Sequence, residues 1–138
     1  MMDFSPPWMS TVLRIAGVYN LSWGATVIFF PNFFFELAEM ETPAYPMIWQ
    51  CVGMIVGVYG IGYLAAATQP YRHWPITLVG FLGKVFGPIG FAWYLAEGAF
   101  PLNWGLIIVF NDLVWWLPFG LILWGAWKSR PKAQQLYH

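Results

Sequence analysis

Residues 74–97 read WPITLVGFLGKVFGPIGFAWYLAE, an apolar run in which Lys84 is the only charged side chain before the final glutamate. A helix rises about 1.5 Å per residue, so this run is long enough to cross a hydrocarbon core of about 30 Å. An ionisable side chain at that depth is costly and is by default a hypothesis about function. The stretch therefore predicts a transmembrane helix with a buried charge near its middle.

The composition of the whole chain is typical of an integral membrane protein. Of its 138 residues, 59% are hydrophobic and only 9% are charged, and the mean hydropathy is +0.58. A soluble domain carries roughly 25% charged residues, so these charges are too few to cover a surface in water. The net charge of zero does not point to nucleic acid as a partner. We expect the lipid bilayer to be the immediate partner.

Turn-forming residues divide the chain into four apolar segments, at about residues 9–30, 47–68, 74–97 and 102–127. Each segment has about 20 residues or more, which is enough to span a bilayer with some tilt. Because short turns join consecutive segments, we predict an all-α polytopic protein. Its single domain, residues 1–138, is a bundle of four transmembrane helices.

Apart from Lys84, the lysine and arginine side chains lie on one side of this predicted topology. They are Arg14, Arg72, Lys128, Arg130 and Lys132. The connections on the other side, residues 31–46 and 97–102, carry glutamates and no basic residue. By the positive-inside rule, both termini are predicted to be cytoplasmic, in a multi-pass protein of a bacterial inner (cell) membrane.

The first outer connection and the glycines add detail to this prediction. Residues 31–41 mix aromatic and acidic side chains at helical spacing, which predicts a short amphipathic segment on the membrane surface or, alternatively, a docking surface for a partner. The third span places glycines at positions 80, 83, 87 and 90, and the first two spans carry further small residues. Small residues let membrane helices approach closely, so these stripes predict a compact bundle.

Lys84 and Asp112 are predicted to lie at the same depth. Lys84 follows His73 by eleven residues, which places it about 16 Å from one membrane edge. Asp112 follows Asn103 by nine residues on a helix that runs the other way, which places it about 13–14 Å from the opposite edge. We therefore predict that these two side chains form an intramembrane salt bridge near the midplane.

Two prolines lie close to this level. Pro88 cannot donate a hydrogen bond to the carbonyl of Lys84, and Pro118 cannot donate one to the carbonyl of Val114. A carbonyl freed inside a membrane needs another donor, and broken helices at this depth are typical of ligand and ion sites in transporters.

Two interpretations of the midplane residues remain open. In the first, the charged pair only fixes which helices pack together, since buried pairs specify an arrangement more often than they add stability. In the second, the polar groups line an apolar pocket for a quinone, a pigment or a lipid. The candidate ligand-binding residues are Lys84, Asp112, Asn20, Tyr59, Asn111, Trp115, Trp116 and Trp23.

The sequence offers little support for catalysis or for a protein-ligated metal. Cys51 is the only cysteine, and two histidines are too few for a three-histidine zinc site. Because the second histidine, His138, is terminal, it and His73 are not expected to form a buried two-histidine haem site. No pairing of a nucleophile with a base is evident, so we name no catalytic residue and do not favour an enzyme. A cofactor, if the chain carries one, would be a quinone, a pigment or a lipid.

The run Leu13-Arg14-Ile15-Ala16-Gly17, the helix exit from Trp23-Gly24 to Phe30-Pro31 and the four-span layout resemble the small bacterial membrane proteins of the DoxX-like type. This resemblance implies an accessory or structural subunit of a larger membrane complex, with membrane-protein partners or further copies of itself. It transfers no catalytic residue. The alternative function is a binder or carrier of a small amphipathic ligand at the Lys84–Asp112 site.

Overall fold

The computed structural model describes residues 3–134, and every regular element in that range is helical. Four helical stretches are long and apolar enough to cross a membrane: Pro7–Phe29, Pro46–Ala66, Trp74–Ala96 and Leu102–Arg130. The first three are the single α-helices α1, α3 and α4. This confirms the predicted all-helical chain with four helices of membrane-spanning length.

The fourth stretch is not one uniform helix. It begins with a 3₁₀ turn, η1 (Leu102–Trp104), and a short helix, α5 (Gly105–Ile108). A π-helical turn, η2 (Val109–Leu113), then precedes α6 (Val114–Gln134). The wider turn lies just before Pro118, in the part of the helix that carries Asp112.

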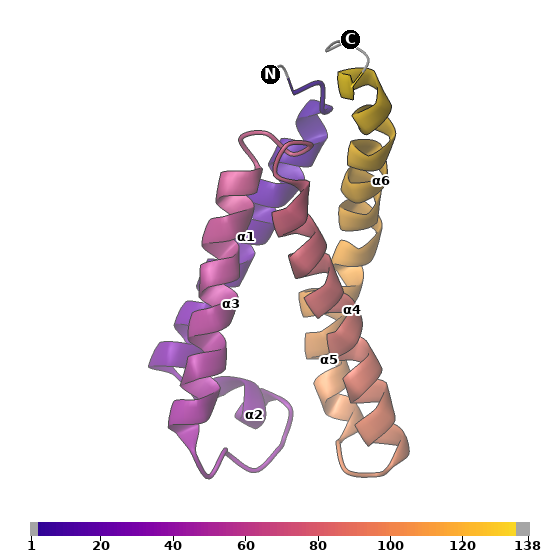
Figure 1. Ribbon diagram of the computed structural model, residues 1–138. Coiled ribbons are helices and arrows are strands. Elements are labelled where there is room, and N and C mark those ends of the chain that lie inside the picture. Colours follow the sequence, from indigo (N-terminus) through magenta and orange to yellow (C-terminus); the bar gives the residue numbers. More distant parts are fainter. Residues whose placement is uncertain (1–2, 135–138) are drawn as a thin grey trace.

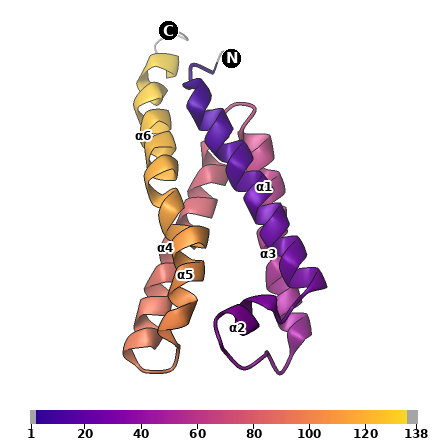
Figure 2. The same cartoon turned by 180° about the vertical axis from the view of Figure 1, so that it is seen from behind.

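The four long helices form two pairs whose backbones lie closest together at one end (Figure 1). α1 lies along α3, and α4 lies along α5 and α6; the same division is visible from behind (Figure 2). We call the end near both chain termini the converging end and the opposite end the diverging end. The sequence predicted a compact bundle, and in the structure α3 and α4 separate progressively from their connecting loop onward.

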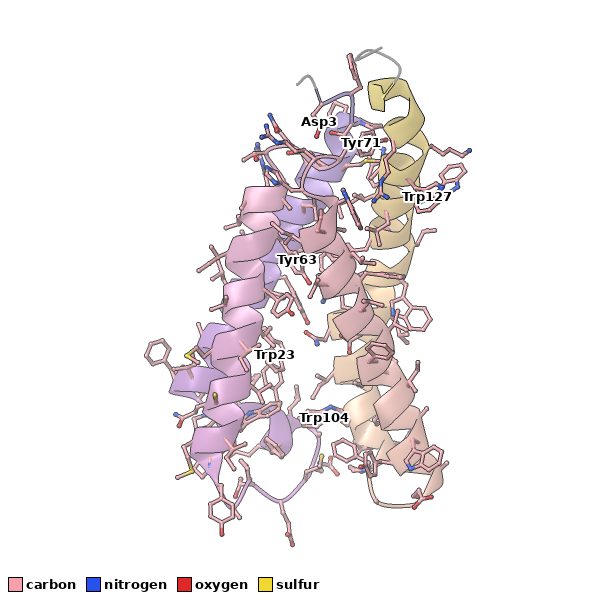
Figure 3. All side chains as sticks on the ribbon, viewed as in Figure 1. Asp3, Trp23, Tyr63, Tyr71, Trp104 and Trp127 are labelled. Carbon is pink, nitrogen blue, oxygen red and sulfur yellow. The ribbon has the colours of Figure 1, made fainter. Side chains whose placement is uncertain are left out.

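A hydrophobic core fills the converging end. It consists of Met9, Leu13, Ala16, Tyr63, Ala66, Ala67, Phe119 and Ile122. The ring of Tyr63 reaches from α3 to Gly80 of α4 and meets the edge of Phe119 at 5.2 Å between ring centroids. Tyr63 therefore contacts both helices of the other pair (Figure 3).

The N-terminal segment is tied to the loop between α3 and α4. One carboxylate oxygen of Asp3 accepts the backbone N–H groups of Tyr71, at 3.0 Å, and of Arg72, at 3.3 Å. Burial by itself raises the pKa of Asp3, but its hydrogen bonds with Ser5, Arg72 and Tyr71 together outweigh that effect and lower the pKa. The ionised carboxylate therefore holds the loop in place.

α1 and α3 approach closely because glycines face each other along their contact. A Cβ atom on Gly60 would lie 2.7 Å from the carbonyl oxygen of Gly17. One on Gly24 would overlap the carbonyl oxygen of Gly53. Gly57, on the same helix, faces open space. This pair is thus built on backbone-to-backbone contact.

The glycine stripe of α4 is used only in part. Gly80 faces the ring of Tyr63, and Gly87 faces the carboxylate of Asp112. A Cβ atom on Gly83 or Gly90 would meet nothing within 4 Å. Two of the four glycines therefore serve a close contact among the described residues, and the other two do not.

Aromatic side chains join the two pairs at the diverging end. We call Trp23, Phe34, Phe35, Trp49, Phe100 and Trp104 the aromatic cluster. The ring of Trp104, from η1, lies 5.2 Å from that of Phe35 and 5.9 Å from that of Trp49. Asn103 also donates a hydrogen bond from its side chain to the carbonyl of Ala38, at 3.4 Å.

The segment predicted to lie on the membrane surface has an additional role. It contains the short helix α2 (Phe33–Leu37) at the diverging end (Figure 1). Phe33 and Leu37 are exposed, as expected of an interfacial segment. Phe34 stacks on Trp23 and Phe35 packs against Trp49, so two of its three phenylalanines belong to the aromatic cluster.

We predict that Gly24→Ala destabilises the protein, whereas Gly57→Ala does not. The added methyl group at position 24 overlaps the backbone of α3, and such overpacking costs roughly 1–3 kcal/mol. At position 57 the methyl group meets open space. The free energy of unfolding in mixed detergent micelles, measured for both variants, tests this. Equal stabilities would show that the close contact between α1 and α3 does not exist.

Candidate functional site

The charged candidates meet in the middle of the α4–η2 contact. Lys84 and Asp112 are only 5% and 6% exposed. Lys84 follows Gly80, which contacts the converging-end core, and precedes Phe91, which packs against Phe100 of the aromatic cluster. The site therefore lies between the two apolar layers that join the helix pairs.

Lys84 and Asp112 do not form the predicted salt bridge. The Lys84 ammonium donates a hydrogen bond to the backbone carbonyl of Asn111, at 2.7 Å. Within the described part of the chain, no basic nitrogen lies within 4.0 Å of a carboxylate oxygen. The Asp112 carboxylate lies against Gly87 instead, and Asn111 donates its side-chain N–H to it at 3.3 Å. Shared depth did not bring the two charges within salt-bridge distance, and the ammonium of Lys84 bonds to the carbonyl of Asn111 instead.

The carbonyl that Pro88 frees has found a donor. The indole Nε1 of Trp116 donates to the carbonyl of Lys84 at 2.8 Å. α4 therefore gives a side-chain donor to the backbone of η2, and α6 gives one to the backbone of α4. We call these two hydrogen bonds, Lys84 to Asn111 and Trp116 to Lys84, the reciprocal clamp.

The π-helical turn shapes this contact. The backbone N–H of Val114 bonds to the carbonyl of Val109, five residues earlier, where an α-helix would reach back four. The indole of Trp115 donates to the carbonyl of Phe110 at 3.2 Å, and its ring lies 5.6 Å from the Lys84 ammonium. π-Helical turns occur frequently at functional sites.

The remaining candidates lie on the other helix pair. Asn20 donates from its side chain to the carbonyl of Val56 at 3.3 Å and so joins α1 to α3. Tyr59 is half-buried and packs against the ring of Tyr63. Trp23 belongs to the aromatic cluster (Figure 3). The structure therefore unites Lys84, Asn111, Asp112, Trp115 and Trp116, and separates them from Asn20, Tyr59 and Trp23.

One side chain joins these two groups, and another was missed altogether. The ring of Tyr19, from α1, lies 5.8 Å from that of Trp115. Tyr63 is 1% exposed and was not among the sequence candidates. Its position four residues after Tyr59 places both tyrosines on one helix face, and that spacing could have identified it.

Several buried polar atoms have no hydrogen-bond partner among the described residues. They are Asn20 Oδ1, Trp23 Nε1, Trp49 Nε1, Thr77 Oγ1 and Asn111 Oδ1. An unpaired polar atom in an apolar medium costs free energy, so each one in a folded protein calls for an explanation. Pairing of these atoms with a bound polar molecule is one such explanation.

The described residues contain no group of three or more His, Cys, Asp or Glu side chains that could hold a metal ion. His138 lies outside the described residues. No family model matches the chain, and neither does any curated protein or solved structure with which it was compared. The resemblance to the DoxX-like type therefore stays a prediction.

We predict that Trp116→Phe destabilises the protein by about 1–3 kcal/mol, because it leaves the Lys84 carbonyl buried without a donor. In a Pro88→Ala background the same substitution should cost less than about half as much, since the restored N–H at position 88 bonds to that carbonyl. A double-mutant cycle of unfolding free energies measures the difference.

Trp127→Phe is the matched control for this cycle, because Trp127 is 68% exposed. It should leave the unfolding free energy nearly unchanged. A cost of Trp116→Phe that is the same with proline and with alanine at position 88 would contradict the reciprocal clamp.

Proposed function

We propose that the chain binds a small amphipathic molecule between its two helix pairs, with a polar group of that molecule at Lys84 and Asp112. The observation that carries this proposal is a surplus of hydrogen-bonding capacity at the site. The Lys84 ammonium has three donors, of which one bonds to Asn111. Asp112 is 6% exposed, and the one side chain that donates to it is Asn111.

The reciprocal clamp favours this function over a purely architectural one. Lys84 and Trp116 tie α4 to η2 and α6 without any contribution from the Asp112 side chain. The Asp112 carboxylate makes neither bond of the clamp, and ionisable residues inside a membrane mark substrate or ion sites. Asp112 is therefore the residue whose presence most requires a ligand.

The surroundings define the class of molecule. Apolar walls with few polar groups suit a ligand that is itself mostly apolar, such as a quinone, a pigment or a lipid. Lys84 would donate to a carbonyl or an anionic oxygen, and Asp112 would accept from a hydroxyl group. The role as an accessory subunit of a larger complex, expected from the resemblance, also stays a prediction.

We predict that Asp112→Asn lowers the affinity for the native ligand by about 10- to 100-fold, which corresponds to the loss of a hydrogen bond to a charged group. The substitution keeps the size of the side chain and leaves both bonds of the reciprocal clamp in place. The measurement is the amount of small molecule per protein, by mass spectrometry of solvent extracts from the purified protein.

Glu97→Gln removes a negative charge from an exposed position and serves as the control. It should retain the wild-type ligand content. The proposal fails if wild-type protein carries no small molecule, or if Asp112→Asn carries as much as wild type.

We also propose that the converging end, with both termini, faces the cytoplasm, as the basic side chains indicate. Several of them lie there against aromatic rings: Lys128 is 3.7 Å from the centroid of Trp124, and Arg130 is 4.1 Å from that of Trp74. Such pairs of basic and aromatic side chains are common where a helix leaves the membrane.

In a Cys51→Ser background, Ala99→Cys at the diverging end should react with a membrane-impermeant maleimide on intact cells. Thr68→Cys, in the loop at the converging end, should react only after permeabilisation. Both positions are exposed. The opposite labelling pattern would invert the proposed topology.

A further inference from the structure

We infer that the α1–α3 pair carries a recognition point for a hydroxyl group, formed by Asn20 and Trp23 with a second indole donor from Trp49. This inference rests on the proposed function, because it names the chemical class of the ligand: an amphipathic molecule that bears a hydroxyl. It concerns the α1–α3 pair, which lies opposite Lys84 and Asp112. The polar atoms of α1 and α3 have no role in the reciprocal clamp.

Asn20 presents a fixed acceptor. Its side chain is 4% exposed, and its Nδ2 is already committed to the carbonyl of Val56. That hydrogen bond sets the orientation of the amide, because a flip would lose it. The oxygen Oδ1 consequently points away from Val56, and it has no partner among the described residues.

Trp23 presents a fixed donor on the same helix face. It follows Asn20 by three residues, and side chains at that spacing are neighbours on a helix. Its ring is 8% exposed and is held by stacking on Phe34, at 5.2 Å, and by an edge contact with Trp49, at 5.6 Å. Its Nε1 is buried without an acceptor, and so is the Nε1 of Trp49.

An acceptor and a donor one helical turn apart are complementary to a hydroxyl group. The hydroxyl hydrogen donates to Asn20 Oδ1, and the hydroxyl oxygen accepts the N–H of Trp23 or Trp49. A ketone, an ester or an ether accepts from the indoles but leaves Asn20 Oδ1 unpaired. The bilayer core holds no water to complete these hydrogen bonds. An alcohol therefore pairs with more of the unpaired polar atoms of α1 and α3 than a ketone, an ester or an ether does.

The test compares a prenyl alcohol, farnesol, with its methyl ether, in which a methyl group replaces the hydrogen that Asn20 would accept. Binding to the purified full chain in lipid nanodiscs is followed by the indole ¹H–¹⁵N signals, with the Trp23 signal assigned from its loss in Trp23→Phe. We expect wild type to bind the alcohol about five- to tenfold more tightly, which corresponds to one hydrogen bond.

Trp23→Phe keeps the aromatic ring and removes the donor, so it should reduce the preference for the alcohol to about twofold or less. Trp104→Phe is the matched control, because Trp104 lies in the same aromatic cluster, is equally buried at 8% exposed, and is not among the side chains with an unpaired buried atom. It should keep the wild-type preference, and the Trp23 indole signal should move when the alcohol binds.

Asp112→Asn separates this inference from the proposed function. A preference that Trp23→Phe abolishes and Asp112→Asn retains supports the hydroxyl site on α1. A preference that Asp112→Asn abolishes and Trp23→Phe retains overturns this inference while upholding the site at Asp112. Equal binding of alcohol and ether to wild type, as expected if only water pairs with Asn20 and Trp23, overturns it as well.

Discussion

The reciprocal clamp is the interaction on which the α4 side of this molecule depends. Pro88 leaves the carbonyl of Lys84 without its helical donor, and Lys84 itself brings an ammonium group into an apolar environment. Each problem is answered by the neighbouring helix: the indole of Trp116 donates to the carbonyl, and the carbonyl of Asn111 accepts from the ammonium. Without the fourth stretch, α4 would expose an unpaired polar group to lipid, and the fourth stretch would do so without α4. We therefore expect the two to fold together.

The two helix pairs are held by different physics. Between α1 and α3, glycines such as Gly17 and Gly60 let the two backbones touch, so this pair is held by close packing. Between α4 and the fourth stretch, the two hydrogen bonds of the reciprocal clamp hold the helices together near their middle. The pairs meet through Tyr63 at one end and through the aromatic cluster at the other. The level between these apolar layers is where the polar candidates lie.

Much of this could be predicted from the sequence, and the reason lies in what a sequence encodes directly. Apolar runs gave the four long helices, and helical rise gave the depth of Lys84 and Asp112. Because Pro88 has no N–H group, the sequence indicated that the Lys84 carbonyl needs another donor. It did not indicate that this donor is Trp116. Rotation about the helix axis was not predictable. Asp112 lies within the π-helical turn at Val109–Leu113, so the direction of its side chain departs from the regular rotation of about 100° per residue, and equal depth did not become contact.

The candidate site divides into two halves, and both keep hydrogen-bonding capacity that the described residues do not use. On the α4 side, the freed carbonyl is paired with Trp116, whereas Lys84 uses one of its three donors and Asn111 Oδ1 has no partner. On the α1 side, Asn20 and Trp23 are held rigidly by Val56 and by the aromatic cluster, yet an oxygen and an N–H remain unpaired. A molecule that pairs with both sides would also join the two helix pairs at the level where few protein contacts do so. By linkage, its binding would favour their present arrangement over any wider separation, in proportion to its affinity for that arrangement.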